Sequence, residues 1–97
     1  SIAGAKGAVE GLTRSLAAEW APAIRVNAIA PSLTDTPLAN GLLGTAEKRA
    51  ASAERHPLKR VAGPEEVASL AAWLLSDGAK SVSGSVLAVD GGMSTIR

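Results

Sequence analysis

The side chains with the clearest capacity for chemistry lie in a short segment, 31–37 (PSLTDTP), which carries Ser32, Thr34, Thr36 and an aspartate between two prolines. Hydroxyls donate and accept hydrogen bonds, so this segment could hold a polar ligand. It follows an apolar stretch that is predicted to be a strand, and in open α/β sheets ligands bind beyond the carboxyl ends of the strands. The residue types alone favour a plain strand-to-helix loop in which Thr36 caps the residues after Pro37.

Other reactive residue types are scarce. There is no cysteine, which excludes disulfides, thiolate catalysis and thiolate metal sites. His56 is the only histidine and cannot build a histidine metal centre alone, so no metal site is expected. Because His56 stands beside Pro57 and near Lys59, we expect a solvated loop histidine rather than a catalytic base.

The charge balance excludes another class of partner. Ten lysines and arginines against nine aspartates and glutamates leave a formal net charge of +1 in 97 residues. No stretch is dense in basic residues, so nucleic-acid binding is not expected.

The sequence contains neither a signal peptide nor an apolar run long enough to cross a membrane, which favours a soluble, cytoplasmic protein without a membrane partner. The only methionine is Met93, so the chain is either processed or part of something longer.

Two kinds of periodicity predict the elements that must position these groups. Residues 3–20 are predicted to form a helix that ends before Pro22, with apolar side chains recurring at helical spacing: Val9, Leu12, Leu16 and Trp20. Trp20 and Trp73 are expected to be core or subunit-contact residues. Glycines form a separate stripe on the first helix that would let another backbone approach closely: Gly4, Gly7 and Gly11.

Two short apolar runs predict strands. Residues 24–30 are rich in β-branched side chains and stop at Pro31, and within them Asn27 is expected to brace neighbouring backbone rather than touch substrate. Residues 86–89 form the second strand, closed by a turn at 90–92 in which the Asp90 carboxylate bonds to backbone. Two buried strands cannot satisfy both edges of a sheet, so partner strands are expected from missing chain or from another subunit.

Two further helices separate these strands. Residues 38–55 are polar, with Thr45 as a plausible cap for the piece 46–55, and could be a mobile flap or an ordinary exposed helix. A clearer helix has Gly63 as its capping residue and Pro64 in its first position, and its apolar face comprises Val67, Leu70, Ala71, Leu74 and Leu75. The order helix, strand, helix, helix, strand predicts an α/β fold, with residues 1–97 as a single partial domain without repeats or linkers.

Several segments, taken together, resemble the carboxyl-terminal half of a classical short-chain dehydrogenase/reductase. They cover nearly the whole chain in the right order and at normal spacing: AKGAV (5–9), LTRSLA (12–17), IRVNAIAP (24–31), RVAGPEEVA (60–68) and SGSVLAVDGG (83–92). The resemblance implies a Rossmann-type doubly wound parallel sheet, incomplete on its own, with NAD or NADP as cofactor. It implies hydride exchange with an alcohol or carbonyl. The glycine-rich dinucleotide fingerprint of the family does not occur in this chain and is expected before residue 1.

The same resemblance assigns the catalytic pair. The family places a tyrosine four residues before a lysine, and the lysine lowers the phenol pKa and bonds to the nicotinamide ribose. Lys6 matches that lysine, whereas the tyrosine position is occupied by Ile2. Isoleucine has no proton to transfer. Ser1 would point about 100° away on a helix and is not a replacement acid.

The hydroxyl-rich segment resembles the family's P-G-x-x-x-T loop, which grips the nicotinamide carboxamide. Pro31 would shape the turn, and Thr34 and Thr36 would contact the cofactor. Ser32 stands where the family has glycine, which makes a positive φ harder at that position. The cofactor-binding residues implied by the resemblance are therefore Lys6, Pro31, Ser32, Thr34 and Thr36.

The leading hypothesis is part of an NAD(P)-dependent oxidoreductase that acts on a small alcohol or carbonyl and forms a homo-oligomer or joins a missing amino-terminal half. The 97-residue chain alone is expected to be inactive. Because Ile2 replaces the tyrosine, a degenerate or non-catalytic member that acts as an assembly or binding module stays open. A freestanding small-ligand binding domain is the least favoured hypothesis, since the sheet is incomplete.

Overall fold

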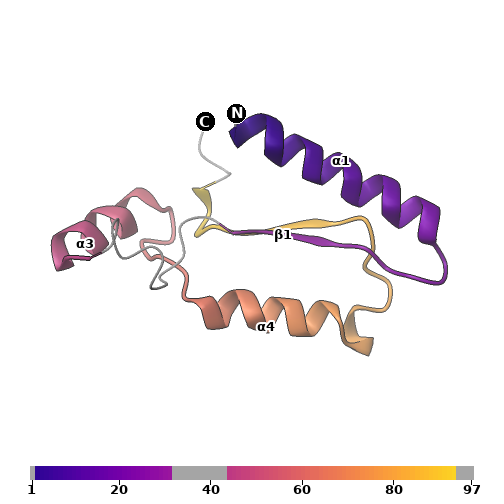
Figure 1. Cartoon of the computed structure of the whole chain (residues 1–97). Coiled ribbons are helices and arrows are strands. Elements are labelled where there is room, and N and C mark those ends of the chain that lie inside the picture. The colour runs from indigo at the N-terminus through magenta and orange to yellow at the C-terminus, as the bar shows by residue number, and fades with distance from the viewer. Residues whose placement is uncertain (1, 32–43, 94–97) are drawn as a thin grey trace. The chain divides into compact units, whose positions relative to one another are not determined.

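The computed structural model describes residues 2–31 and 44–93 (Figure 1). The elements follow in the order that the sequence predicts, with a short 3-10 turn before the last strand: α1 (Ile2–Trp20), β1 (Ala28–Pro31), α3 (Ala46–Arg55), α4 (Pro64–Leu74), η2 (Asp77–Ala79) and β2 (Val86–Val89). The predicted first helix is confirmed to within one residue. Pro31 is the last residue of β1 rather than the residue after it.

The buried side of α1 differs from the predicted apolar stripe. Thr13 and Ala17 are its buried residues, and Ala17 faces Gly84, where an added Cβ would stand 3.5 Å from the Ala17 Cβ. The Thr13 hydroxyl donates to the Val9 carbonyl at 2.7 Å, so its burial leaves no unpaired donor. The apolar stripe itself is exposed at Val9, Leu12 and Trp20. Small side chains, and not the large ones, therefore let α1 approach the strands.

The two strands form one parallel sheet of order β1-β2, which matches the predicted pairing of the two apolar runs. The pairing extends beyond the strand bounds, because Gly84 donates to the Val26 carbonyl at 2.7 Å and Ala28 donates to the Ser85 carbonyl at 2.9 Å. In a regular parallel ladder a single residue would donate to the Val26 carbonyl and accept from the Ala28 N–H. Here Gly84 and Ser85 share these two bonds, so the segment before β2 carries one extra residue. Gly84 absorbs the irregularity with a φ of 75°.

Asn27 repairs the irregular pairing. Its side-chain oxygen accepts from the Ser85 N–H at 3.1 Å, and its side-chain nitrogen donates to the Val82 carbonyl at 2.9 Å. The first of these bonds satisfies an amide that the interrupted ladder leaves without a backbone partner. The predicted role of Asn27 as a brace for neighbouring backbone is confirmed.

Both predicted caps of the later helices are present. Thr45 accepts a hydrogen bond from the Lys48 N–H at 3.1 Å and begins α3 where the sequence places it. At the start of α4, the Glu66 carboxylate reaches back to the Gly63 N–H at 2.7 Å, while Glu66 N–H donates to the Gly63 carbonyl at 3.1 Å. This reciprocal arrangement is that of a capping box with glycine in the capping position.

The chain divides into two compact units, 1–29 with 71–87 and 30–70 with 88–97. The first holds α1, the amino-terminal ends of the strand segments and the end of α4. Its buried apolar residues are few: Ala17, Leu74 and Ala79. Trp20 and Trp73 are both exposed, so the core alternative predicted for them is wrong, and the alternative of a subunit contact stays a prediction. No helix in the described ranges is both long and apolar enough to span a bilayer.

Candidate functional site

Lys6 lies on the side of α1 that faces the strands. On a helix of 3.6 residues per turn, Lys6 falls within about 20° of both Thr13 and Ala17, the buried residues of α1. The Lys6 side chain is nevertheless exposed, because it lies two turns before Thr13, beyond the part of the helix that is covered. The helix therefore carries an uncovered cation on the line that packs against the sheet.

Ile2 begins α1 and lies one helical turn before Lys6. Four residues on a helix correspond to about 40° of rotation, so positions 2 and 6 share a face. The helical spacing that the resemblance requires for the catalytic pair is thus present in the backbone. Whether Lys6 acts as the family's lysine stays a prediction.

The other predicted cofactor residues fall at or beyond the end of β1. Pro31 is exposed and ends that strand. Ser32, Thr34 and Thr36 lie outside the described residues, and their predicted contacts stay predictions. Lys6 belongs to the first unit and Pro31 to the second, and each is described here within its own unit.

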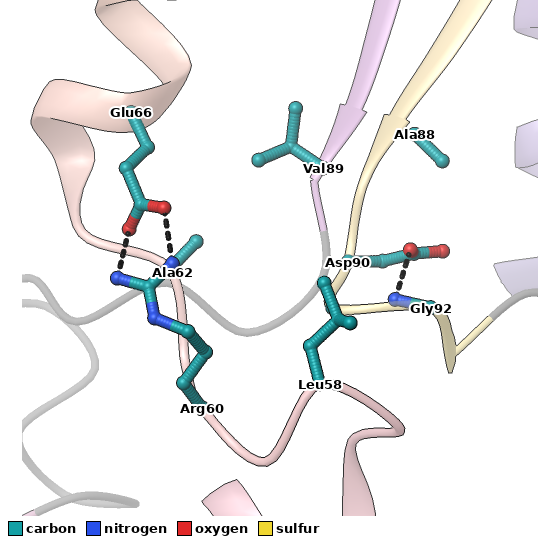
Figure 2. A pocket seen from close by; sticks show the side chains of 9 residues that line it. Leu58, Arg60, Ala62, Glu66, Ala88, Val89, Asp90 and Gly92 are labelled. Atoms are coloured by element: carbon teal, nitrogen blue, oxygen red, sulfur yellow. Dashed lines mark hydrogen bonds and ion pairs between the residues drawn. The ribbon is translucent and has the colours of Figure 1, made fainter.

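In the second unit, a cavity of about 240 Å³ lies at the carboxyl end of β2 (Figure 2). Apolar side chains line part of it, and an ion pair and the turn after β2 line the rest: Leu58, Arg60, Ala62, Glu66, Ala88, Val89, Asp90, Gly91 and Gly92. The predicted turn at 90–92 is confirmed, since the Asp90 carboxylate accepts from the Gly92 N–H at 3.0 Å.

Electrostatics at this cavity centre on Arg60 and Glu66. The two side chains make paired contacts of 2.5 and 3.1 Å (Figure 2). Glu66 also accepts a hydrogen bond from the Gly63 N–H at 2.7 Å. These hydrogen bonds, first from Arg60 and then from the Gly63 backbone, lower the pKa of Glu66. The hydrogen bond to Glu66 raises the pKa of Arg60 further above its usual range. Because Arg60 and Glu66 neutralise each other, neither offers an unpaired charge to a ligand. Their pairing connects the segment before α4 to that helix.

His56 corrects the sequence prediction. It was expected in a solvated loop, yet its side chain is only 3% exposed, and its Nδ1 lies 2.6 Å from the Ser52 carbonyl. The Cα of Gly91 packs against it so closely that a Cβ there would stand 3.1 Å from His56 Cβ and Cδ2. The burial depends on this turn, which lies far along the chain from His56.

The pairing of Arg60 with Glu66 and the bond from the Gly63 N–H to the Glu66 carboxylate were not predicted from the sequence. A signal was available, because glycine at 63 with glutamate three residues later resembles the spacing of a capping box. No local signal indicates the contact between His56 and Gly91. In the described part of the chain, no three acidic or histidine side chains gather as a metal site would require.

In the first unit, a groove of about 400 Å³ lies between the β1 strand segment and the end of α4. Its lining is largely apolar: Arg25, Val26, Asn27, Ile29, Ala71, Leu74 and Leu75. Leu75, predicted on the apolar face of α4, is 85% exposed. This uncovered apolar surface agrees with the prediction that the fold is incomplete on its own.

Comparison with known proteins finds a matching family and similar chains over nearly the whole sequence. The family described as enoyl-(acyl carrier protein) reductase matches residues 1–94. The chain is 50% identical over 97 residues to cis-4-hydroxycyclohexanecarboxylate dehydrogenase of Sinomonas cyclohexanicum, covering 99% of this chain and 38% of that protein. The ligand-free structure of Thermoplasma acidophilum aldohexose dehydrogenase matches with a TM-score of 0.83 at 40% identity, over 95% of this chain and 40% of that one.

A third match is to a structure solved in complex with a dinucleotide. The structure of 4-hydroxyisoleucine dehydrogenase complexed with NADH has a TM-score of 0.85 at 29% identity, and the match covers 95% of this chain and 38% of that one. The chain thus spans well under half the length of the proteins it matches. The predicted fold class is confirmed, since the matched structures are Rossmann folds and this chain covers a part of one.

Proposed function

Because this chain belongs to the short-chain dehydrogenase/reductase family, we propose that it is part of an enzyme that transfers hydride between NAD or NADP and a small alcohol or carbonyl compound. The named relatives are dehydrogenases, which supports this reaction class. The activity belongs to the complete protein, since the described chain lacks the glycine-rich fingerprint that would bind the dinucleotide phosphates.

The observation that carries the proposal is the place of Lys6. The Lys6 ammonium is exposed and lies on the same side of α1 as the buried Thr13 and Ala17, so it is available to a ligand. An ammonium offers three hydrogen-bond donors, which suit the hydroxyls of a ribose. Lys6 therefore fits a nicotinamide nucleoside. Pro31, at the carboxyl end of β1, precedes the segment that we propose contacts the carboxamide, with Ser32, Thr34 and Thr36 as its polar groups.

When bound, the dinucleotide supplies or accepts the hydride. This chain would orient the ribose through Lys6. The family's proton-transferring phenol has no counterpart here, because the chain contains no tyrosine. At position 2 the side chain is isoleucine, which has no proton to give to a carbonyl oxygen as negative charge develops there. We infer that the complete protein binds cofactor and turns substrate over slowly.

Cofactor binding tests the first step. The full-length protein that contains this chain is titrated with NADH and with NADPH, and nicotinamide fluorescence is followed. We expect binding by one of the two, weakened about tenfold or more by Lys6→Met, because a hydrogen bond to a charged donor is lost. Lys80→Met removes another exposed lysine and serves as the control. No binding of either dinucleotide by the wild-type protein would refute the proposed function.

Turnover tests the second step. Carbonyl-dependent oxidation of the reduced cofactor is measured for the wild type, Ile2→Tyr and the matched control Ile2→Phe, which adds a ring without the hydroxyl. A correctly placed general acid contributes about 10²–10⁴-fold, so only Ile2→Tyr should accelerate the reaction. If the wild type already matches Ile2→Tyr, another group supplies the proton and the reasoning about Ile2 is wrong.

The exposed apolar residues of α1, Val9, Leu12 and Trp20, support the prediction of a further partner surface. We propose that the complete protein covers it either with its own remaining chain or with a second copy. Light scattering of the full-length protein distinguishes a monomer from a homo-oligomer. The cytoplasmic location stays a prediction.

A further inference from the structure

Residues 56–63, which we call the strap, join α3 to α4 and are fastened at three points within the second unit. His56 bonds to α3, Leu58 bonds to the turn after β2, and Arg60 pairs with Glu66 of α4. Arg60 and Glu66 are exposed enough for water to weaken their pairing. The bond made by His56 is buried, so it is the attachment whose loss costs most.

His56 closes the carboxyl end of α3. Its backbone N–H donates to the Ala53 carbonyl at 3.1 Å, and its Nδ1 lies 2.6 Å from the Ser52 carbonyl. A carbonyl only accepts, so Nδ1 carries the proton in this contact. Ser52 and His56 are 2% and 3% exposed, which makes them the two buried polar residues of this region. The histidine thus satisfies one of the carbonyls that a helix end leaves without a partner.

The same side chain packs against the turn that follows β2. Leu58 N–H donates to the Gly91 carbonyl at 2.8 Å, and Gly91 leaves no room for a side chain beside His56. Gly92 repeats the pattern, since a Cβ there would stand 3.0 Å from Pro57. The absence of side chains at Gly91 and Gly92 therefore lets the strap pack directly against the turn.

This turn lies at one edge of the sheet. The strands are parallel, so Pro31 at the end of β1 and Val89 at the end of β2 mark the same edge. In open α/β sheets this carboxyl edge is where ligands bind. By joining α3 to the turn after β2, His56 sets where α3 lies at that edge.

We propose that His56 is a positioning residue: its bond to the Ser52 carbonyl and its packing on Gly91 hold α3 at the carboxyl edge of the sheet, on the side where the alcohol or carbonyl substrate would bind. The substrate part of this statement rests on the proposed function, whereas the fastening of α3 does not. His56 touches no reacting atom and acts only through α3.

The geometry selects the variants. Asparagine carries an amide nitrogen where histidine carries Nδ1, whereas glutamine carries it nearer the place of Nε2, and leucine fills space without donating. His56→Asn should retain the bond to Ser52, and His56→Leu should lose it. Glu54→Gln removes only the exposed ion pair between Glu54 and Lys59 in the same region, and is the matched control.

Hydrogen exchange of the full-length protein provides the first readout. Amides of 46–55 should exchange about tenfold faster or more in His56→Leu and His56→Gln, because a buried hydrogen bond is lost. His56→Asn and Glu54→Gln should stay within about threefold of wild type, and amides of α1 should be unchanged in all variants. Equal exchange of 46–55 in His56→Leu and wild type, or acceleration spread over the whole protein, would overturn the proposal.

Kinetics provide the second readout. His56→Leu should raise KM for the carbonyl substrate about tenfold while the Kd for the dinucleotide changes less than twofold, and His56→Asn should restore KM. A rise in KM and Kd together, or no change in KM, would refute the positioning role on the substrate side. If wild type has no turnover at all, the proposed function fails alone, and hydrogen exchange decides whether His56 fastens α3.

Discussion

Replacing Gly91 by alanine tests the packing of the second unit directly. Gly91 has a φ of 59°, and holding an L-residue in the left-handed region costs about 1–2 kcal/mol. The new Cβ would also meet His56 Cβ and Cδ2 at 3.1 Å and the Arg60 carbonyl oxygen at 3.2 Å. Overpacking of this kind costs about 1–3 kcal/mol. We therefore expect Gly91→Ala to lower the free energy of unfolding by about 2–5 kcal/mol.

Gly84→Ala separates the two contributions. Gly84 has a φ of 75°, but a Cβ there meets only Ala17 at 3.5 Å, an ordinary contact. It should lose only the backbone part, about 1–2 kcal/mol. The difference between the two variants then measures the crowding between the strap and the turn after β2.

Urea denaturation of the full-length protein is the assay, with the midpoint compared at unchanged slope so that the shift reports stability. Gly91→Ala should unfold at clearly lower urea than Gly84→Ala. If the two variants unfold together, or if Gly91→Ala is the more stable, Gly91 does not lie against His56 and Arg60 as described, and the reasoning about the strap fails with it.

Three further changes probe the caps and the sheet. Thr45→Ala should destabilise α3 by about 1 kcal/mol, since a side-chain cap is lost; Thr45→Ser should not, and equal denaturation midpoints for all three proteins would contradict the capping role. Asn27→Leu should lower the free energy of unfolding by about 1–3 kcal/mol, because the Ser85 amide loses its partner; an unchanged midpoint in urea would show that this amide is satisfied otherwise. Glu66→Gln should lower stability near neutral pH. The folded pKa of Glu66 is lowered, so its contribution is complete above the unfolded value of about 4.3 and disappears as pH falls through the folded value. The urea midpoints of Glu66→Gln and wild type should converge as the pH is lowered from 7 to 3. A difference between the two midpoints that grows on acidification would refute the lowered folded pKa of Glu66.

Much of the local structure could be predicted because its causes lie within one helical turn. The Thr45 cap of α3 and the Gly63–Pro64 start of α4 depend on side chains that reach amides three residues away. The apolar runs predict both strands, although β1 begins at Ala28 rather than at residue 24. The pairing of residues 26–28 with 84–85 is irregular, and the sequence of one strand does not predict an extra residue in the strand that pairs with it.

The candidate site was predictable only through resemblance. Helical spacing places Ile2 and Lys6 on one face, but assigning them a role needs the family's tyrosine and lysine. The packing of His56 against Gly91 in the second unit follows neither from helical spacing nor from the family resemblance. Burial of His56 requires Gly91, and the sequence around His56, with its proline and lysine, indicates a solvated loop.

The apolar stripe of α1 also shows which features the sequence predicts and which depend on tertiary packing. Periodicity establishes that α1 is a helix and that Val9, Leu12 and Trp20 share one side of it. Which side meets the strands is a different question, because it depends on how closely two backbones can approach. Ala17 and Gly84, far apart in the sequence, face each other with small residues, since even an added Cβ at Gly84 would stand 3.5 Å from Ala17 Cβ. Thr13 and Ala17 are accordingly buried, and the large apolar residues remain exposed. Local sequence thus sets the elements and their caps, while their buried faces are decided by the partners that tertiary folding brings to them.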